Sequence, residues 1–113
     1  MNLKQTSQSL NLELMKLYEI AHSRAGDKGN TLTLSLIPYH ESDYDMLCER
    51  VTVDKVKNHL HEIVSGEIIR YALPNISSLL FVCHNALLGG VTTSMAVDTH
   101  GKTLSYALLE IDI

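Results

Sequence analysis

The clearest pattern in the chain is a strict alternation of leucines with small hydroxyl residues. From Thr31 to Ile37, Leu occupies every second position and Thr or Ser most of the positions between. Because successive side chains of a strand point to opposite faces, this pattern predicts a half-buried strand that Pro38 ends. A continuous apolar run, Leu79 to Cys83, predicts a central strand buried on both faces.

Other apolar segments predict the remaining strands. All but the first are bounded by Gly, Pro or Asp residues, which favour turns and are depleted in strands. A glycine in the turn between the last two segments suits a hairpin. The predicted strands are Leu17–His22, Glu67–Leu73, Val91–Val97 and Lys102–Ile111, and the predicted hairpin turn is Asp98–Gly101.

A helical period appears in the middle of the chain. Apolar residues from Val53 to Val64 recur every three or four positions, which predicts a helix that Gly66 terminates. A shorter helix is predicted to begin at Ser42, with Asp45 completing an imperfect capping box.

The order of these elements favours an α+β fold. The helices are clustered rather than alternating with strands, which argues for a largely antiparallel sheet. The simplest architecture packs two helices on one face of a single sheet and leaves the other face to water or a second subunit. Residues 1–14 are polar and show no clear period, so we expect a flexible N-terminal arm ahead of one domain, residues 15–113.

Composition narrows the classes of function. The chain has 113 residues, 45% of them hydrophobic and 19% charged, which suits one globular domain. A formal net charge of −4 and the lack of a Lys/Arg-rich run argue against a nucleic-acid-binding protein. With no bilayer-length apolar stretch and no signal-peptide pattern, we expect a cytoplasmic protein without a membrane partner. The two cysteines lie far apart in no metal-type spacing, so we expect neither a disulfide nor a metal, and no cofactor.

The first candidate for chemistry is the segment Ser23–Asn30, which we predict to be a glycine-containing loop between two strands. Glycines let backbone N–H groups approach a ligand and form an anion-binding nest. Arg24 can hold a carboxylate or phosphate through two hydrogen bonds, and Lys28 adds a point charge. The alternative is a glycine turn with a solvated ion cluster, because the spacing is not that of a P-loop. The predicted ligand-binding residues of this loop are Ser23, Arg24, Gly26, Gly29 and Asn30.

The second candidate is the segment His84–Gly90, which we predict to be a loop after a buried strand. His84 can act as a general acid or base near neutral pH, and Asn85 can orient it or a ligand. The alternative is a histidine that only satisfies the end of its strand. Cys83 is a poor nucleophilic partner for His84, because consecutive strand residues face opposite sides. A single site requires the two loops to lie within about 15 Å of each other. The predicted catalytic residues are Asp27, Lys28 and His84.

Together these residues resemble one known family, the small C-terminal domain of the acyclic terpene utilisation protein A (AtuA-like) family. The first loop is similar to the family's A-x-[SA]-R-[SA]-G-D-K-G-[DN] segment. The resemblance covers residues 17–111, nearly the whole chain. Its three parts are Ala21–Asn30, the helix with Val56-Lys57 followed by Arg70-Tyr71-Ala72-Leu73-Pro74, and Leu80–Gly90.

The resemblance implies a ferredoxin-like α+β fold and a link to the breakdown of branched or terpenoid acids as coenzyme A thioesters. In longer members of the family this domain follows a large N-terminal domain, which we expect this chain to lack. Leu88 and Val91 stand where the family often has further glycines, which implies a stiffer second loop.

Three functions are consistent with these features. The first is an accessory subunit that docks on a larger AtuA-like chain and binds an acyl-CoA or a carboxylate through its loops. The second is a small stand-alone enzyme, a homo-oligomer that acts on acyl-CoA at sites between subunits. The third is a non-enzymatic oligomerisation or binding module, because small antiparallel sheets commonly pair through an exposed face or edge.

Overall fold

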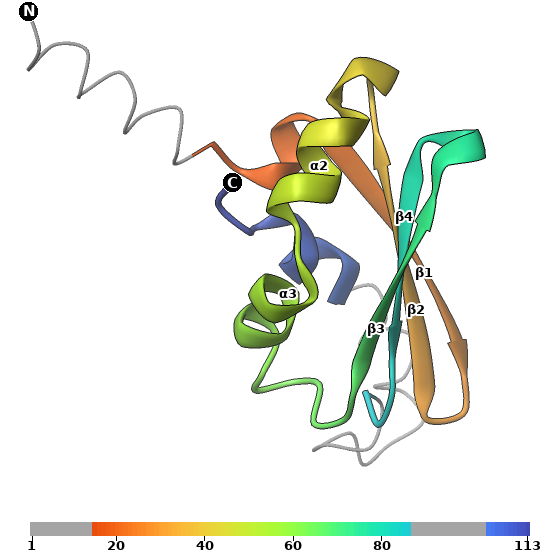
Figure 1. The fold of residues 1–113 in the computed structure, drawn as a ribbon. Helices are drawn as coiled ribbons and strands as arrows, with labels where there is room; N and C mark the ends of the chain where they lie inside the picture. The colour runs from red at the N-terminus through yellow and green to blue at the C-terminus, as the bar shows by residue number, and fades with distance from the viewer. Residues whose placement is uncertain (1–14, 87–103) are drawn as a thin grey trace, which may run out of the picture.

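The described part of the chain forms two layers, a sheet and a group of helices (Figure 1). The structure, a computed structural model, describes residues 15–86 and 104–113. Four strands form one antiparallel sheet in the order β1-β2-β4-β3, and the helices lie on one face of this sheet. The predicted α+β class and the largely antiparallel sheet are therefore confirmed.

The strands and helices follow the predicted order from the first loop to the second. The strands are β1 (Ala21–Lys28), β2 (Thr31–Pro38), β3 (Ile68–Leu73) and β4 (Ser78–Cys83). The helices are α2 (Tyr44–Arg50) and α3 (Val53–His59), and a further helical segment covers residues 104–109. Short 3-10 turns are Leu17–Glu19, Glu41–Asp43 and Pro74–Ile76. None of these helices is long and apolar enough to cross a bilayer.

The register of the sheet sorts its residues onto two faces. On the inner face, Leu34 lies opposite Phe81 and Leu36 opposite Leu79, and all four side chains are fully buried. The predicted alternation of β2 is thus confirmed. On the outer face, the apolar side chains of β4 are half-buried, so the expectation of a strand buried on both faces is wrong in part. No helix or strand among the described residues covers this outer face (Figure 1).

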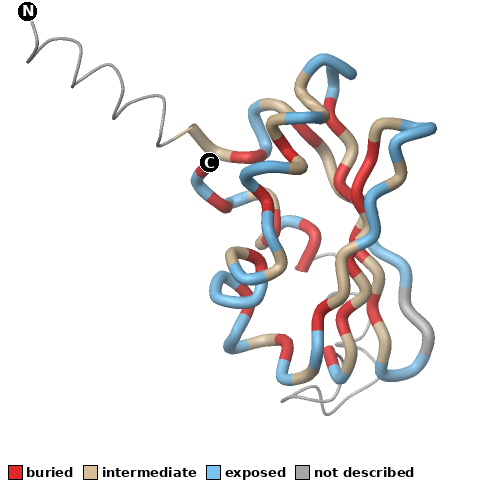
Figure 2. The backbone as a smooth tube through the Cα atoms, viewed as in Figure 1, coloured by how far each residue is buried: buried red, intermediate tan, exposed pale blue. Residues whose placement is uncertain are grey.

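The helices cover the inner face through side chains at helical spacing. α2 contributes Leu47, α3 contributes Val56, and Leu60 follows directly after α3; all three are fully buried. Figure 2 shows buried positions where the helices and the sheet face each other. The Thr52 hydroxyl caps α3 by accepting a hydrogen bond from the N–H of Lys55 at 3.2 Å.

The predicted helix ends differ from those observed. α3 ends at His59, whereas the predicted helix ends at Val64. The chain stays turned beyond α3, because the N–H of Val64 donates to the carbonyl of Leu60 at 2.9 Å. The side chains of Leu60 and Val64 are both buried in the core. The shorter helix begins at Tyr44, after a 3-10 turn that contains Ser42.

Two predicted strands are wrong within the described residues. The segment Leu17–Glu19 is a 3-10 turn, and the first strand starts only at Ala21. Residues 104–109 are helical, although Lys102–Ile111 reads as a strand. Leu104, Leu108 and Ile111 are buried and recur at helical spacing, which explains the outcome. The predicted arm 1–14, the strand 91–97 and the turn 98–101 lie outside the described residues.

The two ends of the domain pair with each other. The N–H of Leu17 donates to the carbonyl of Ile111 at 2.8 Å, and the N–H of Ile113 donates to the carbonyl of Met15 at 2.9 Å. We call residues 15–17 and 110–113 the terminal clasp. It closes the helical layer, because the buried side chains of Leu17, Ile111 and Ile113 all join the core.

Candidate functional site

The predicted loop Ser23–Asn30 is mostly strand. β1 continues to Lys28, and only Gly29 and Asn30 form the turn to β2. Gly29 has a φ of 64°, a left-handed conformation that glycine adopts without steric cost. β1 lies at the edge of the sheet, where charged residues and glycine are tolerated, and this explains why its composition resembles that of a loop.

Strand alternation divides the predicted ligand-binding residues between two faces. Ser23 pairs with Leu36 on the inner face, and its hydroxyl is buried without a hydrogen-bond partner in the structure. Arg24 pairs with Ser35 on the outer face and is exposed. Gly26 lies on that outer face too, two residues further along β1. The sheet therefore separates the side chains of Ser23 and Arg24, and the ligand-binding roles of these residues stay predictions.

The described parts of the two candidate segments nevertheless meet at one end of the sheet, and residues 87–90 of the second segment lie outside the described residues. The N–H of Ala86 donates to the carbonyl of Asn30 at 3.1 Å. In the register, the backbones of Lys28 and His84 flank Thr31, the first residue of β2, on its two sides. The backbones of Lys28 and His84 are therefore two strand spacings apart, about 10 Å. This distance is shorter than the separation of about 15 Å beyond which the two segments could not share a single site. We call Lys28–Asn30 together with His84–Asn85 the turn end of the sheet.

A third segment, Ser65–Glu67, holds the second turn in place. Gly66 lies so close to His84 that a Cβ at this position would overlap the His84 carbonyl oxygen. The N–H of His84 donates to the carbonyl of Glu67 at 2.9 Å, and Ser65 Oγ donates to the carbonyl of Asn85 at 3.3 Å. Asn85 has a φ of 57°, which Asn tolerates better than most residues. The sequence pointed to Gly66 only as a helix terminator, so this supporting role was missed.

Three polar side chains of the turn end have no bonding partner in the part of the chain that the structure describes. Within the described residues, the side chains of Asn30, His84 and Asn85 take part in no hydrogen bond or ion pair. Asn30 and Asn85 are exposed, and His84 is half-buried. These groups are therefore available to a ligand. The structure places the backbone of Asp27 and Lys28 beside them, and the catalytic roles of Asp27, Lys28 and His84 stay predictions.

Another histidine near the first candidate segment lies elsewhere. His22 is at the start of β1, opposite Ile37, and its ring stacks on Tyr39 with the centroids 5.3 Å apart. Six residues of extended strand, roughly 20 Å, separate His22 from Lys28, so His22 does not join the turn end.

Cys83 does not supply a nucleophile. Its side chain is fully buried, and burial raises its pKa to about 11. Since the thiolate is the reactive form, this thiol is inert near neutral pH. Within residues 15–86 and 104–113, no three His, Cys, Asp or Glu side chains are grouped closely enough to hold a metal ion.

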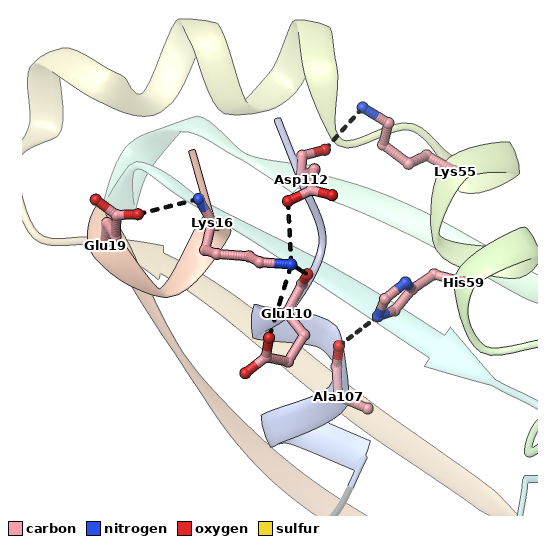
Figure 3. A network of polar contacts seen from close by, with 7 residues as sticks. All are labelled: Lys16, Glu19, Lys55, His59, Ala107, Glu110 and Asp112. Atoms are coloured by element: carbon pink, nitrogen blue, oxygen red, sulfur yellow. Dashed lines mark hydrogen bonds and ion pairs between the residues drawn. The ribbon is translucent and has the colours of Figure 1, made fainter. Parts of the chain in front are cut away.

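A shallow cleft of about 470 Å³ lies between α3 and the terminal clasp, lined by Lys55, Asn58, His59, Ile111 and Asp112. Lys55 and His59 in this cleft already hold the fold together (Figure 3). Lys55 Nζ donates to the carbonyl of Asp112 at 3.2 Å, and His59 Nε2 donates to the carbonyl of Ala107 at 2.7 Å. The turn end therefore offers more unused polar groups to a ligand than this cleft does.

Comparison with known proteins gives one match. A family model described as the AtuA ferredoxin-like domain matches residues 15–113. All described residues lie inside that range, and the observed α+β sheet agrees with the name of the model. No curated protein and no solved structure matches the chain.

Proposed function

Because this chain belongs to the AtuA ferredoxin-like domain family, we propose that it is an accessory binding domain for anionic acyl compounds. It docks on a larger AtuA-like chain and contributes the turn end of its sheet to a site for an acyl-CoA or a carboxylate. The pathway that we propose is the breakdown of branched or terpenoid acids as coenzyme A thioesters.

The observation that carries this proposal is the contrast between used and unused polar side chains. Arg70, Lys55 and His59 each donate hydrogen bonds to backbone carbonyls and thereby hold the fold together. At the turn end, the side chains of His84 and Asn85 make no such bond within the described residues. Polar groups that are held in place without serving the fold favour a binding role.

The charges around the turn end suggest where an anion binds. Lys28 lies on the β1–β2 side of His84, and Arg24 lies further along β1. Glu67 is exposed on the β3 side, where its carboxylate repels an anion. We therefore place the carboxylate or phosphate of the ligand on the β1–β2 side, within reach of Lys28 and the exposed turn Gly29–Asn30.

Binding to coenzyme A and to branched acyl-CoA thioesters, measured by calorimetry, tests the ligand class. Lys28→Ala and His84→Ala are each expected to weaken binding about tenfold or more, the usual effect of losing one charge-assisted hydrogen bond. Lys57→Ala is the matched control, because it removes one exposed cation from α3. Equal affinities for all three variants would contradict the proposed site.

Purification of the chain from its native host at endogenous level tests the partner. We expect a larger AtuA-like chain to co-purify in fixed stoichiometry, and the acyl-CoA affinity to rise in the complex because the partner completes the site. Recovery of the chain without any larger protein would contradict the docking part of the proposal and leave the ligand part to the calorimetry.

A further inference from the structure

The edge of the sheet formed by β3 has unused backbone hydrogen-bonding groups. The N–H of His84 donates to the carbonyl of Glu67, which sets the alternation of the β3–β4 ladder. In an antiparallel ladder the residues between the bonded pairs point their N–H and C=O groups outward. These residues are Ile68, Arg70 and Ala72, and nothing in the described part of the chain bonds to their outward groups.

The two edges of the sheet differ in how well they are protected against pairing. β1 carries Arg24, Asp27, Lys28 and two interior or adjacent glycines, features that discourage edge-to-edge association. β3 has neither proline nor lysine within it. Its single charge, Arg70, lies on the inner face and donates to the carbonyls of Cys48 in α2 and of Val51 directly after it. β3 is therefore the edge that is open to another strand.

The outer face of β3 is apolar. Ile69, Tyr71 and Leu73 lie on this face by the register, and Tyr71 is 49% exposed. A large apolar side chain that is half exposed beside unpaired backbone groups favours a partner strand over water.

We propose that β3 pairs antiparallel with β3 of a second copy of this chain, joining the two sheets into one. The symmetry axis passes between the two Tyr71 residues. In this register the outward N–H and C=O groups of Arg70 form hydrogen bonds with those of Ala72 of the second copy. By symmetry, the outward groups of Ala72 pair in the same way with those of Arg70 of the second copy.

The side chains of β3 are self-complementary in this register. Tyr71 faces Tyr71 of the second copy, and Ile69 faces Leu73, so every cross-strand pair on the outer face is apolar or aromatic. Arg70 faces an alanine rather than another arginine, so no like charges lie directly opposite. This self-complementarity identifies a second copy, rather than an unrelated strand, as the occupant.

The proposed contact consists of one strand from each copy and is roughly 20 Å long. Its area falls in the class of small interfaces, below about 1,200 Å², that give weak or transient complexes. We therefore expect a dimer that dissociates on dilution, with a dissociation constant on the order of micromolar.

Sedimentation of the full chain over about a hundredfold range of concentration tests the dimer. Ala72→Pro removes one outward N–H, at an edge position where proline is tolerated, and is expected to weaken dimerisation about tenfold or more. Ala25→Pro is the matched control, because Ala25 has the same outward position on β1. It is expected to leave the dimer unchanged.

Disulfide trapping tests the register without depending on the proline variant. Facing residues of a non-hydrogen-bonded pair have Cα atoms about 4.5 Å apart, a distance that a disulfide spans. Tyr71→Cys is therefore expected to form disulfide-linked dimers under mild oxidation. Tyr39→Cys substitutes another exposed tyrosine, 59% exposed, and is not expected to form such dimers. Ile69→Cys and Leu73→Cys are expected to link to each other in a mixture, but neither to itself.

A chain that stays monomeric at every concentration overturns the proposal. It is also overturned by a dimer that Ala72→Pro and Ala25→Pro affect equally, or by equal trapping of Tyr71→Cys and Tyr39→Cys. Occupation of the β3 edge by a strand of a larger partner, seen as disulfide trapping of Tyr71→Cys to that partner and not to a second copy, overturns the assignment to a second copy.

Discussion

Gly66 is the residue on which the shape of the turn end depends most directly. A methyl group at this position would overlap the His84 carbonyl oxygen, and the obstructing atoms belong to the backbone, which cannot rotate away. Gly66→Ala is therefore expected to lower the free energy of unfolding by about 1–3 kcal/mol and to shift the amide resonances of His84 and Asn85. Chemical denaturation and an NMR comparison of the two proteins measure both effects.

Ser65→Ala is the control for Gly66→Ala. It removes only the hydrogen bond from Ser65 Oγ to the carbonyl of Asn85, so it is expected to cost about 1 kcal/mol or less. If Gly66→Ala were as mild as Ser65→Ala, the close approach of Gly66 to His84 would not be a constraint on the fold.

Cys83 makes stability depend on pH in the alkaline range. Burial raises its pKa from the ordinary thiol value of 9.0 to about 11, so the folded protein holds this proton more tightly than the unfolded chain does. The stabilisation is fully present below pH 9 and is lost as the pH rises towards about 11. The total loss is roughly 2–3 kcal/mol.

Urea denaturation at several alkaline pH values measures this effect of Cys83. Cys83→Ala is expected to be less stable at neutral pH, because it leaves a cavity, but to lose less stability between pH 9 and about 11. Cys48→Ala keeps the buried thiol and is expected to keep the full pH dependence. The same pH dependence in all three proteins would show that other groups cause it.

At the scale of the elements, Arg70 links the sheet to the end of α2. Its Nη1 donates to the carbonyls of Cys48 at 2.7 Å and Val51 at 2.9 Å, which the helix itself leaves without partners. Arg70→Met keeps most of the side-chain volume but removes these charge-assisted bonds. It is expected to lower the free energy of unfolding by about 1.5–3 kcal/mol.

Arg50→Met is the matched control for Arg70→Met. Arg50 is also near the end of α2, but it is exposed, so its substitution is expected to change stability by about 0.5 kcal/mol or less. Thermal or chemical unfolding of the two variants compares them directly. A loss for Arg50→Met equal to that for Arg70→Met would contradict the assignment of Arg70 as the link.

The elements that could be predicted from the sequence are those whose period is set by the core. The alternation of β2 and the helical spacing after Val53 both reflect side chains that are buried on one side. β1 could not be placed, because an edge strand with glycines and charges has the composition of a loop. Residues 104–109 were misassigned because their short apolar sequence fits either period, and packing on the core decides between them.

The candidate site could be predicted from the sequence only in part. His84 and the Gly29–Asn30 turn stood out by residue type, and the pairing of β2 with both neighbours brings them together. The separation of Ser23 from Arg24 follows from strand alternation, which a loop assignment hides. The support from Gly66 depends on a contact between segments 18 residues apart, and no local pattern reveals such a contact.

At the scale of the whole molecule, the proposed surfaces are separate. The turn end involves the β1–β2 turn and the residues after β4, whereas the proposed dimer uses the outer edge of β3. A variant of the β3 edge such as Ala72→Pro is therefore expected to keep its acyl-CoA affinity, and Lys28→Ala to keep its dimer. The two proposals can accordingly fail independently.

The terminal clasp holds the two ends of the domain together, and its apolar part is expected to dominate. Lys16 Nζ lies 3.1 Å from Asp112 Oδ1 (Figure 3), and this hydrogen bond raises the pKa of Lys16. The Lys16 side chain is 37% exposed, so water and salt screen the ion pair and it contributes little. Ile111, in contrast, is only 2% exposed.

Two substitutions separate these contributions to the terminal clasp. Ile111→Ala is expected to lower the free energy of unfolding by about 2–5 kcal/mol, because it removes buried methyl groups and leaves a cavity. Lys16→Met is expected to change the unfolding midpoint little and to abolish whatever salt dependence the ion pair confers. Thermal unfolding at low and high salt measures both variants. A loss of stability for Lys16→Met as large as that for Ile111→Ala would mean that the ion pair, and not the core, holds the two ends together.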